Sequence, residues 1–240
     1  MGMPVTVAVS GASDRSLIDQ VFVWFEAVDR RFSTWRTDSE ISDINAGRHP
    51  ECAWSGEMRE VLALCDRTRQ ESDGYFDART PNGIIDPSGV VKGWAIRKAA
   101  AIIERAGEHN YYVDAGGDIQ SAGLSASGRP WRVGVQSPFD RSEIVKIVEP
   151  RGRGVATSGS YVRGRHIYVP GSPDRTVDDV VSLTVIGPDV LEADRFATAA
   201  FAMGGDGIAF IERTPGLEGF QVMSDRTAVA TTGFAEFCPS

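Results

Sequence analysis

The sequence contains few of the residues on which several classes of protein depend. Cysteine occurs only at positions 52, 65 and 238, an odd number at wide spacing. This pattern provides neither a disulfide framework nor a tetrahedral zinc site, and it suits a reducing compartment. No apolar run approaches the ~20 residues that a membrane-spanning helix needs. We therefore expect neither a disulfide-stapled domain nor a membrane span.

Lysine is scarce as well, and acidic residues outnumber basic ones. The 240 residues carry a formal net charge of −8, and lysine occurs only at positions 92, 98 and 146. Because no basic face is available for a phosphate backbone, the chain is not expected to bind nucleic acid. The first residues lack the basic and apolar regions of a signal peptide, so a cytoplasmic location is expected unless residues upstream of this chain are missing.

The order of the predicted elements indicates the fold class. Period-2 alternation predicts strands, and 3.6-residue periodicity predicts helices. The predicted helices cover about 13–28, 57–70, 89–107, 192–205 and 207–213, and the predicted strands cover about 4–10, 111–116, 131–137, 143–149, 166–170, 179–187, 219–224 and 227–232. This order lacks regular βαβ alternation. It predicts an α+β fold, with mixed, largely antiparallel sheets and packed helices, in a single compact domain over residues 1–240.

The N-terminal part contains an amphipathic helix followed by a long polar connection. The helix, capped by Ser13 or Asp14, is predicted to bury one face. That face consists of Leu17, Ile18, Val21, Phe22, Phe25 and Val28. The connection, residues 30–45, is polar and turn-rich but carries Phe32 and Trp35, so it is a candidate binding loop.

The segment IDPSGVVKGW, residues 85–94, places Asp86 and Lys92 on either side of a turn that opens a helix. Unpaired N–H groups at a helix start attract anions, and Lys92 would add a positive charge there. Asp86 can accept hydrogen bonds from a ribose or a heterocycle. A helix cap at Asp86 and a solvated Lys92 explain the same residues equally well. Both interpretations remain open.

A glycine pair interrupts the segment DAGGDIQSAG, residues 114–123. Gly116 and Gly117 can adopt positive φ or let the backbone pass close to a ligand. Asp114 and Asp118 flank the pair. The spacing by itself favours a hairpin turn with Asx-type hydrogen bonding.

Two further positions carry groups suited to chemistry. Asp194 and Thr198 are four residues apart in a predicted helix and therefore share a face. Their oxygens suit Mg²⁺; the alternative is that Asp194 caps the helix and Thr198 bonds back to a carbonyl. His166, in a strand-like run after a Ser- and Gly-rich loop, can take a proton from a hydroxyl, although a lone histidine is more often structural.

Taken in order, these segments resemble the motifs of a known family. The chain contains an MG start, FSTWRTDSEISDIN, GYFD, DPSGVVKGWA, DAGGDIQSAG, VATSG, HIYVP and ADRFATAAFAMG. The ordered set, from residue 1 to about residue 204, is similar to that of the ApbE-type FAD:protein FMN transferases. The D-x-x-G-x-x-K-G and D-x-x-x-T elements are its most specific parts.

The resemblance implies an enzyme with an ApbE-like, T-fold-related architecture that binds FAD and Mg²⁺. Such an enzyme transfers FMN from FAD to a Thr or Ser hydroxyl of an acceptor flavoprotein subunit or domain and releases AMP. His166 matches the general base of the family. The implied FAD contacts are Met1, Trp35, Tyr75, Phe76, Asp77, Asp86, Lys92 and Ile167, and the implied metal ligands are the carbonyl of Gly89 and the side chains of Asp194 and Thr198.

One of the departures from the family pattern is a shortened segment in the middle of the chain. Only eight residues separate Asp77 from Asp86, where family members usually carry a long insertion. The adenine side of the site is therefore expected to be more open. Two alternative functions use the same residues: a Mg²⁺-dependent FAD pyrophosphatase that gives FMN and AMP, and a non-catalytic FAD-binding protein.

Overall fold

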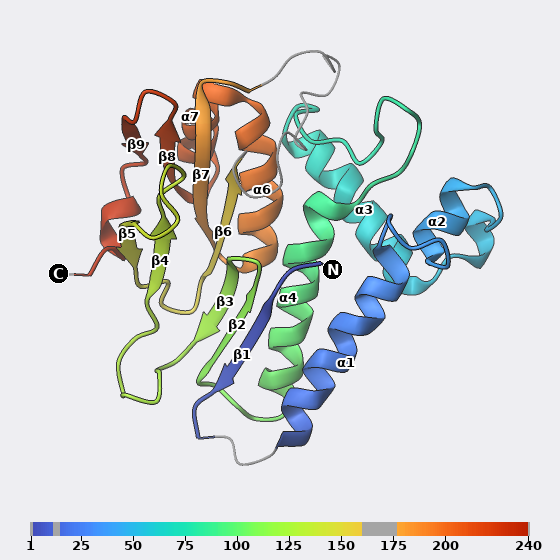
Figure 1. Cartoon of the computed structure of the whole chain (residues 1–240), viewed down its shortest axis with the longest axis horizontal. Helices are drawn as coiled ribbons and strands as arrows, with labels where there is room; N and C mark the ends of the chain where they lie inside the picture. The colour runs from blue at the N-terminus through green and yellow to red at the C-terminus, as the bar shows by residue number, and fades with distance from the viewer. Residues whose placement is uncertain (1, 12–14, 160–176, 240) are drawn as a thin grey trace.

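Figure 1 shows a computed structural model of the chain, which describes residues 2–11, 15–159 and 177–239. Its helices are α1 (Arg15–Phe32), α2 (Glu40–Asn45), α3 (Gly56–Glu71), α4 (Ser88–Arg105), α6 (Val190–Ala202) and α7 (Gly207–Arg213). Short 3-10 helices cover Glu51–Ala53, Gly204–Asp206 and Phe234–Phe237. The strands are β1 (Val5–Val9), β2 (Tyr111–Ala115), β3 (Asp118–Ala122), β4 (Val133–Gln136), β5 (Ile144–Val148), β6 (Gly154–Gly159), β7 (Val180–Gly187), β8 (Glu218–Met223) and β9 (Ala228–Ala230).

Within these residues, seven strands form one sheet in the order β1-β2-β3-β6-β7-β8-β9, and β4 and β5 form a separate hairpin. All the neighbouring strands in both sheets run antiparallel. The α+β class with largely antiparallel sheets is thus confirmed. The predicted strand at 166–170 lies outside the described residues.

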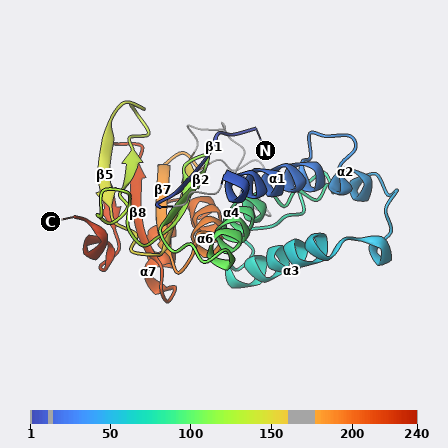
Figure 2. The ribbon, with the colours of Figure 1, turned by 90° about the horizontal axis from the view of Figure 1, so that it is seen from below.

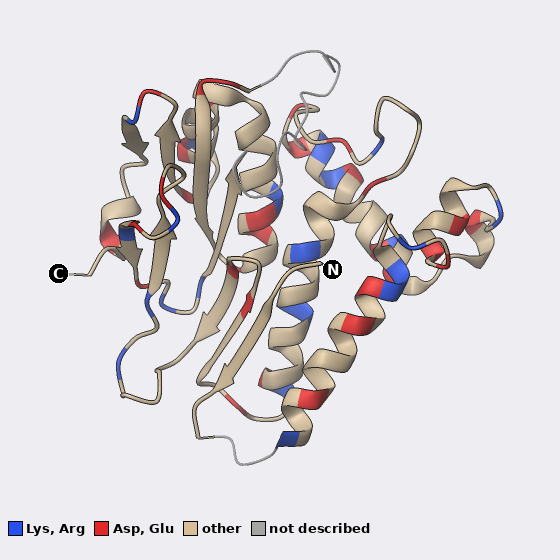
Figure 3. Ribbon diagram, viewed as in Figure 1, with Lys and Arg blue, Asp and Glu red and all other residues tan. Residues whose placement is uncertain are grey.

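The helices and the hairpin cover opposite faces of the sheet. α4 and α6 pack against one face, and α1 and α3 lie beyond α4 (Figure 2). On the other face, Val133 and Val135 of β4 share an apolar cluster with Phe220 and Val222 of β8. Charged residues of both signs line α1, whereas the strands of the large sheet are mainly uncharged (Figure 3). The layers are therefore held together by apolar burial on both faces.

Small residues let α4 and α6 approach closely. A Cβ atom added to Gly93 of α4 would come within 2.8 Å of Cβ of Asp194 and of the carbonyl oxygen of Val190 on α6. Ala197 and Ala200 of α6 are fully buried. This contact places the side chains of the two helices next to one another, and it is what brings residues about 100 positions apart into one site.

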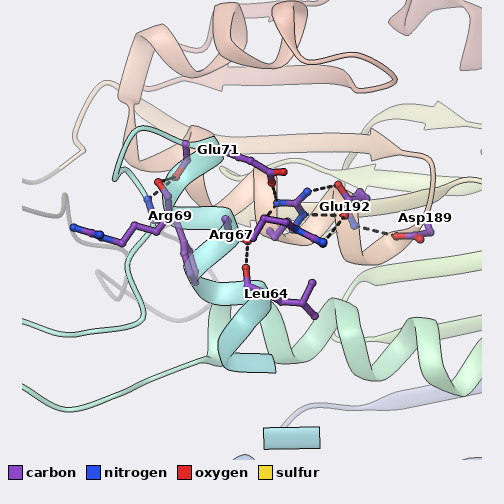
Figure 4. A network of polar contacts seen from close by, with 10 residues as sticks. Leu64, Arg67, Arg69, Glu71, Asp189 and Glu192 are labelled. Atoms are coloured by element: carbon purple, nitrogen blue, oxygen red, sulfur yellow. Dashed lines mark hydrogen bonds and ion pairs between the residues drawn. The ribbon is translucent and has the colours of Figure 1, made fainter. Parts of the chain in front are cut away.

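Arg195 joins α6 to α3. Its side chain is 4% exposed and forms ion pairs with Glu71 of α3 and with Glu192. Its guanidinium carbon also lies 4.0 Å from the ring centroid of Phe196. Figure 4 shows the surrounding network, in which Glu71 and Glu192 approach from the two helices. A buried cation is tolerated here because both carboxylates compensate its charge.

The β2–β3 connection confirms the hairpin interpretation of the glycine pair. Gly116 and Gly117 have φ values of 65° and 94°, and the register pairs Ala115 with Asp118. Oδ1 of Asp114 accepts a hydrogen bond of 2.8 Å from the N–H of Gly117. Positive φ at both central residues is the requirement of a two-residue turn that matches the twist of the strands.

Two parts of the N-terminal region differ from the prediction. Phe22 of α1 is 40% exposed, so its assignment to the buried face was wrong. The buried positions follow a narrower stripe than the predicted face, formed by Leu17, Val21, Phe25, Val28 and Phe32. The connection after α1 contains a helix, α2, whose N-cap Ser39 accepts a hydrogen bond from the N–H of Ser42.

Candidate active site at the end of the sheet

A cavity of about 780 Å³ lies at the end of the sheet where the β2–β3 turn is located. The residues before β1, the turn itself and the end of β6 contribute to its wall, as do α4, α6 and the β4–β5 hairpin. Its volume is within the range of small-molecule and cofactor sites. Eight of the residues to which the family resemblance gave a role line it together: Tyr75, Phe76, Asp77, Asp86, Gly89, Lys92, Asp194 and Thr198.

Gly89 lies in a narrow gap between two of the other predicted residues. A Cβ atom at this position would come within 2.8 Å of Cε2 of Phe76 and within 3.2 Å of Cγ2 of Thr198. The aromatic ring, the start of α4 and the hydroxyl-bearing side chain of α6 are thus in direct contact. The motif glycine is needed here for space.

Two polar side chains fix the loop that leads into α4. Asn45, from the first long motif, donates to the carbonyl of Ile85 at 2.9 Å and accepts from its N–H at 2.8 Å. Oδ1 of Asp86 accepts the N–H of Ser88 at 3.0 Å, next to the formal N-cap, Pro87. Asp86 therefore has the local capping role of the structural interpretation, and it also faces the cavity.

Asp77 is held by groups on its own side of the cavity. Its carboxylate accepts the N–H of Arg79 at 2.8 Å and Nε of Arg69 at 3.0 Å. The pair with Arg69 fixes one orientation of the carboxylate, although the arginine itself is well exposed. Asp77 is thus oriented before any ligand arrives.

Lys92 lies inside the wall of the site. Its side chain is 16% exposed and forms ion pairs with Asp118 and, at 3.5 Å, with Oδ1 of Asp194. The interpretation of Lys92 as a solvated surface residue is therefore wrong. Oδ2 of Asp194 accepts the N–H of Gly93 at 2.8 Å, and the N-cap of α6 is Asp189, so Asp194 is not the helix cap either.

Burial changes the proton affinity of two carboxyl groups here. Desolvation raises the pKa of Asp194, and this effect outweighs the lowering by Lys92. Desolvation also raises the pKa of Asp114, partly offset by the hydrogen bond from Gly117. Both side chains line the cavity. Carboxyl groups with raised pKa values in a cleft are typical of functional sites.

The cavity has lining residues that no sequence motif indicated. The β4–β5 hairpin supplies one wall through Arg132, Val133, Gln136, Arg141 and Ile144. The sequence predicted these two strands only as strands. The hairpin lies over the site because it packs on the large sheet, and the alternation of apolar residues within β4 and β5 does not predict where it packs.

The other four predicted site residues are Met1, Trp35, His166 and Ile167. Trp35 is 95% exposed and is not among the residues that line the cavity. Met1, His166 and Ile167 lie outside the described residues. The described residues contain no group of three or more His, Cys, Asp or Glu side chains placed to hold a metal ion. The assigned roles of all these positions stay predictions.

The ApbE family profile matches the chain over residues 1–81 and 78–221. The chain belongs to the ApbE family. The two matched segments meet at residues 78–81, within the short connection between Asp77 and Asp86.

Relatives of this ApbE member include proteins named FAD:protein FMN transferase. The one from Salmonella typhimurium is 36% identical over 173 residues, which cover 68% of this chain and 49% of the relative. The one from Klebsiella pneumoniae is 34% identical over an alignment of 283 positions, which covers 91% of this chain and 80% of the relative. The chain thus spans about half the length of the Salmonella relative.

Solved structures of ApbE proteins have the same fold. The flavin transferase ApbE from Vibrio cholerae superposes with a TM-score of 0.86 at 25% identity, over 99% of this chain and 96% of that one. The ApbE protein from Thermotoga maritima has a TM-score of 0.84 at 21% identity, over 100% of this chain and 97% of that one.

Within the described residues, no helix combines the length and the apolar character needed to cross a membrane.

Proposed function

We propose that this ApbE-family chain transfers FMN from FAD to a Thr or Ser hydroxyl of an acceptor protein, with Mg²⁺ bound, and releases AMP. One observation carries the proposal. Eight residues to which the family resemblance gave a role, spread from position 75 to position 198, line a single cavity. The names of the relatives support the same reaction class.

The oxygen groups in the cavity fit a magnesium ion. The carboxylate of Asp194, the hydroxyl of Thr198 and the backbone carbonyl of Gly89 are hard-oxygen donors, and α4 and α6 hold these residues close together. Mg²⁺ uses one or two protein carboxylates and completes its shell with phosphate and water. These three residues would hold it. When bound, the ion neutralises phosphate oxygens and favours departure of AMP.

The remaining lining residues are suited to a dinucleotide with an aromatic ring. Tyr75 and Phe76 offer apolar surface for a flavin ring, and Asp77 and Asp86 offer acceptors for N–H or hydroxyl groups. Lys92 adds a fixed positive charge beside Asp194. These side chains bind and orient FAD, so that the acceptor hydroxyl meets the diphosphate in line. His166 is the proposed base that takes the proton of that hydroxyl.

Incubation of the purified chain with FAD, Mg²⁺ and a Thr-containing acceptor domain tests the proposal. We expect AMP release that depends on Mg²⁺ and on the acceptor, and an acceptor band that stays fluorescent in a denaturing gel. Asp194→Ala should abolish both because the carboxylate ligand is lost. Retained turnover in that variant would place the metal elsewhere.

The same assay distinguishes the two alternative functions. Rapid release of FMN and AMP without an acceptor would make the chain an FAD pyrophosphatase. Quenching of FAD fluorescence on binding, with no AMP under any condition, would make it a non-catalytic FAD-binding protein. Either result would overturn the transfer reaction.

A further inference from the structure

A further carboxylate, that of Asp118, lies directly behind the wall of the cavity. Asp118, the first residue of β3, is 1% exposed and is not among the lining residues. The family resemblance gave it no role. An ionised carboxylate at such a depth is costly unless hydrogen bonds and an opposite charge compensate it. Its partners therefore indicate why it is there.

Both oxygens of Asp118 are engaged. Oδ1 accepts a hydrogen bond of 3.1 Å from the N–H of Thr157 on β6. Oδ2 is fully buried and forms the ion pair with Nζ of Lys92 on α4. Asp118 thus links the sheet to the helix whose start forms the site.

Lys92 is shared unequally between two carboxylates. Its Nζ lies closer to Asp118 than to Oδ1 of Asp194, which is 3.5 Å away. If both carboxyl groups are ionised, the three side chains carry a net charge of −1. One negative charge next to the cavity is then left for a cation, even though a lysine stands beside Asp194.

We propose that Asp118 is a positioning residue that holds the ammonium group of Lys92 and so leaves Asp194 available to bind the divalent cation. This inference rests on the proposed function, because it concerns the ion that Asp194 would hold. Asp118 acts through Lys92 and does not itself touch substrate. The hairpin turn does not require an aspartate at position 118, whereas the ion pair with Lys92 does.

Without the charge of Asp118, Lys92 should compete with Mg²⁺ for the carboxylate of Asp194. In Asp118→Asn, the amide oxygen can still accept the N–H of Thr157, but of the two carboxylates only Asp194 remains to pair with Lys92. The pair of Lys92 and Asp194 then carries no net charge and should bind Mg²⁺ more weakly. We expect Mg²⁺ affinity to fall by roughly 10–100-fold, as for other groups that support metal ligands from behind.

Calorimetric titration of the full chain with Mg²⁺, in the absence of FAD, measures this effect without relying on turnover. Asp225→Asn removes the same charge from an exposed turn and should leave Mg²⁺ affinity unchanged. Adding Lys92→Met to Asp118→Asn removes the competing ammonium, so most of the lost affinity should return. Urea denaturation of each variant shows whether it is folded.

Two results of the titration would overturn the inference: wild-type Mg²⁺ affinity in Asp118→Asn, or a loss that Lys92→Met does not reverse, which is the behaviour of a purely structural residue. A wild-type chain that binds no Mg²⁺ would overturn the proposed metal site as well, and this is evident before any variant is made.

Lysine NMR provides a readout that needs neither metal nor FAD. With only three lysines in the chain, the ¹⁵Nζ signals are few, and the one lost in Lys92→Met is that of Lys92. A buried ammonium held by Asp118 should give a slowly exchanging signal that Asp118→Asn removes. Persistence of the signal in that variant would show that Asp118 does not hold Lys92, whatever reaction the protein catalyses.

Discussion

Position 89 requires a residue without a side chain and with a backbone carbonyl that can reach the proposed metal ion. A side chain there would collide with the ring of Phe76 and with Thr198, and the carbonyl of Gly89 is a proposed metal ligand. Gly89→Ala must therefore displace the ring or α6. Because a shift of about 1 Å in a positioned group can cost about 10²-fold in rate, we expect a loss of FMN transfer of that order, measured as AMP release. The accompanying loss of stability should stay below about 3 kcal/mol.

Gly56 offers a matched control. It is the first residue of α3, and a Cβ atom added there would meet nothing within 4 Å. Gly56→Ala should leave transfer unchanged and keep or slightly raise stability, since Ala is favoured over Gly in a helix by up to about 1 kcal/mol. Full activity of Gly89→Ala would show that contact at this position does not matter.

Cation binding at Asp194 should depend on pH. Burial raises the pKa of this carboxyl group, and a metal ligand must be deprotonated. Mg²⁺ must therefore displace a proton from the protonated fraction, so affinity should fall as the pH is lowered from about 8 to about 6. Calorimetry in two buffers with different ionisation enthalpies measures the released proton directly. Equal heats in both buffers at about pH 6 would contradict the raised pKa.

The helix α6 supplies Asp194 and Thr198 to the cavity, and its buried Arg195 anchors it to α3. Replacement by Met keeps the apolar length but leaves Glu71 and Glu192 without their shared partner. These carboxylates are 41% and 27% exposed, so water compensates part of the loss. We expect Arg195→Met to lower the free energy of unfolding by about 2–3 kcal/mol in urea denaturation.

Arg67→Met is the control for this prediction. Arg67 lies in the same network (Figure 4), but it is 52% exposed and 4.0 Å from Glu192. An exposed pair of this kind contributes little, so the change should stay within about 0.5 kcal/mol. Equal changes in the free energy of unfolding for the two substitutions would mean that burial of Arg195 does not increase its contribution to stability.

The molecule as a whole can be tested through its thiols. Cys65 is buried in an apolar cluster to which α1, α3, α4 and β2 all contribute, and desolvation raises the pKa of its thiol. Cys52 is exposed. Because the thiolate is the reactive form, a thiol reagent should modify Cys52 promptly and Cys65 only after unfolding.

Site-resolved mass spectrometry over a urea series measures this. If residues 1–240 form one cooperative unit, the modification of Cys65 should follow the global transition seen by circular dichroism. Modification of Cys65 well before that transition would indicate that the helical part opens separately from the sheet.

Most helices and strands could be predicted from the spacing of apolar residues in the sequence. The helices α1, α3, α4 and α6 and the strands β1, β2, β7 and β8 lie close to their predicted positions because each repeats its apolar residues with its own period. β3 and β6 were not predicted as strands. Their sequences, DIQSA and GVATSG, each contain one large apolar residue among polar or small ones, and neighbouring strands on both sides hold them in the sheet.

The sequence by itself determined the class of fold and the start of α4, because spacing and residue type are local properties, and the resemblance to the ApbE family indicated which motif residues belong together. Only the tertiary structure decided that Lys92 is an internal cation, that Asp118 is its partner, and that the β4–β5 hairpin forms a wall of the cavity. The physical reason is that burial and ion pairing arise from contacts between β3, α4 and α6. Chain segments that meet only after folding leave no periodic signal in the sequence.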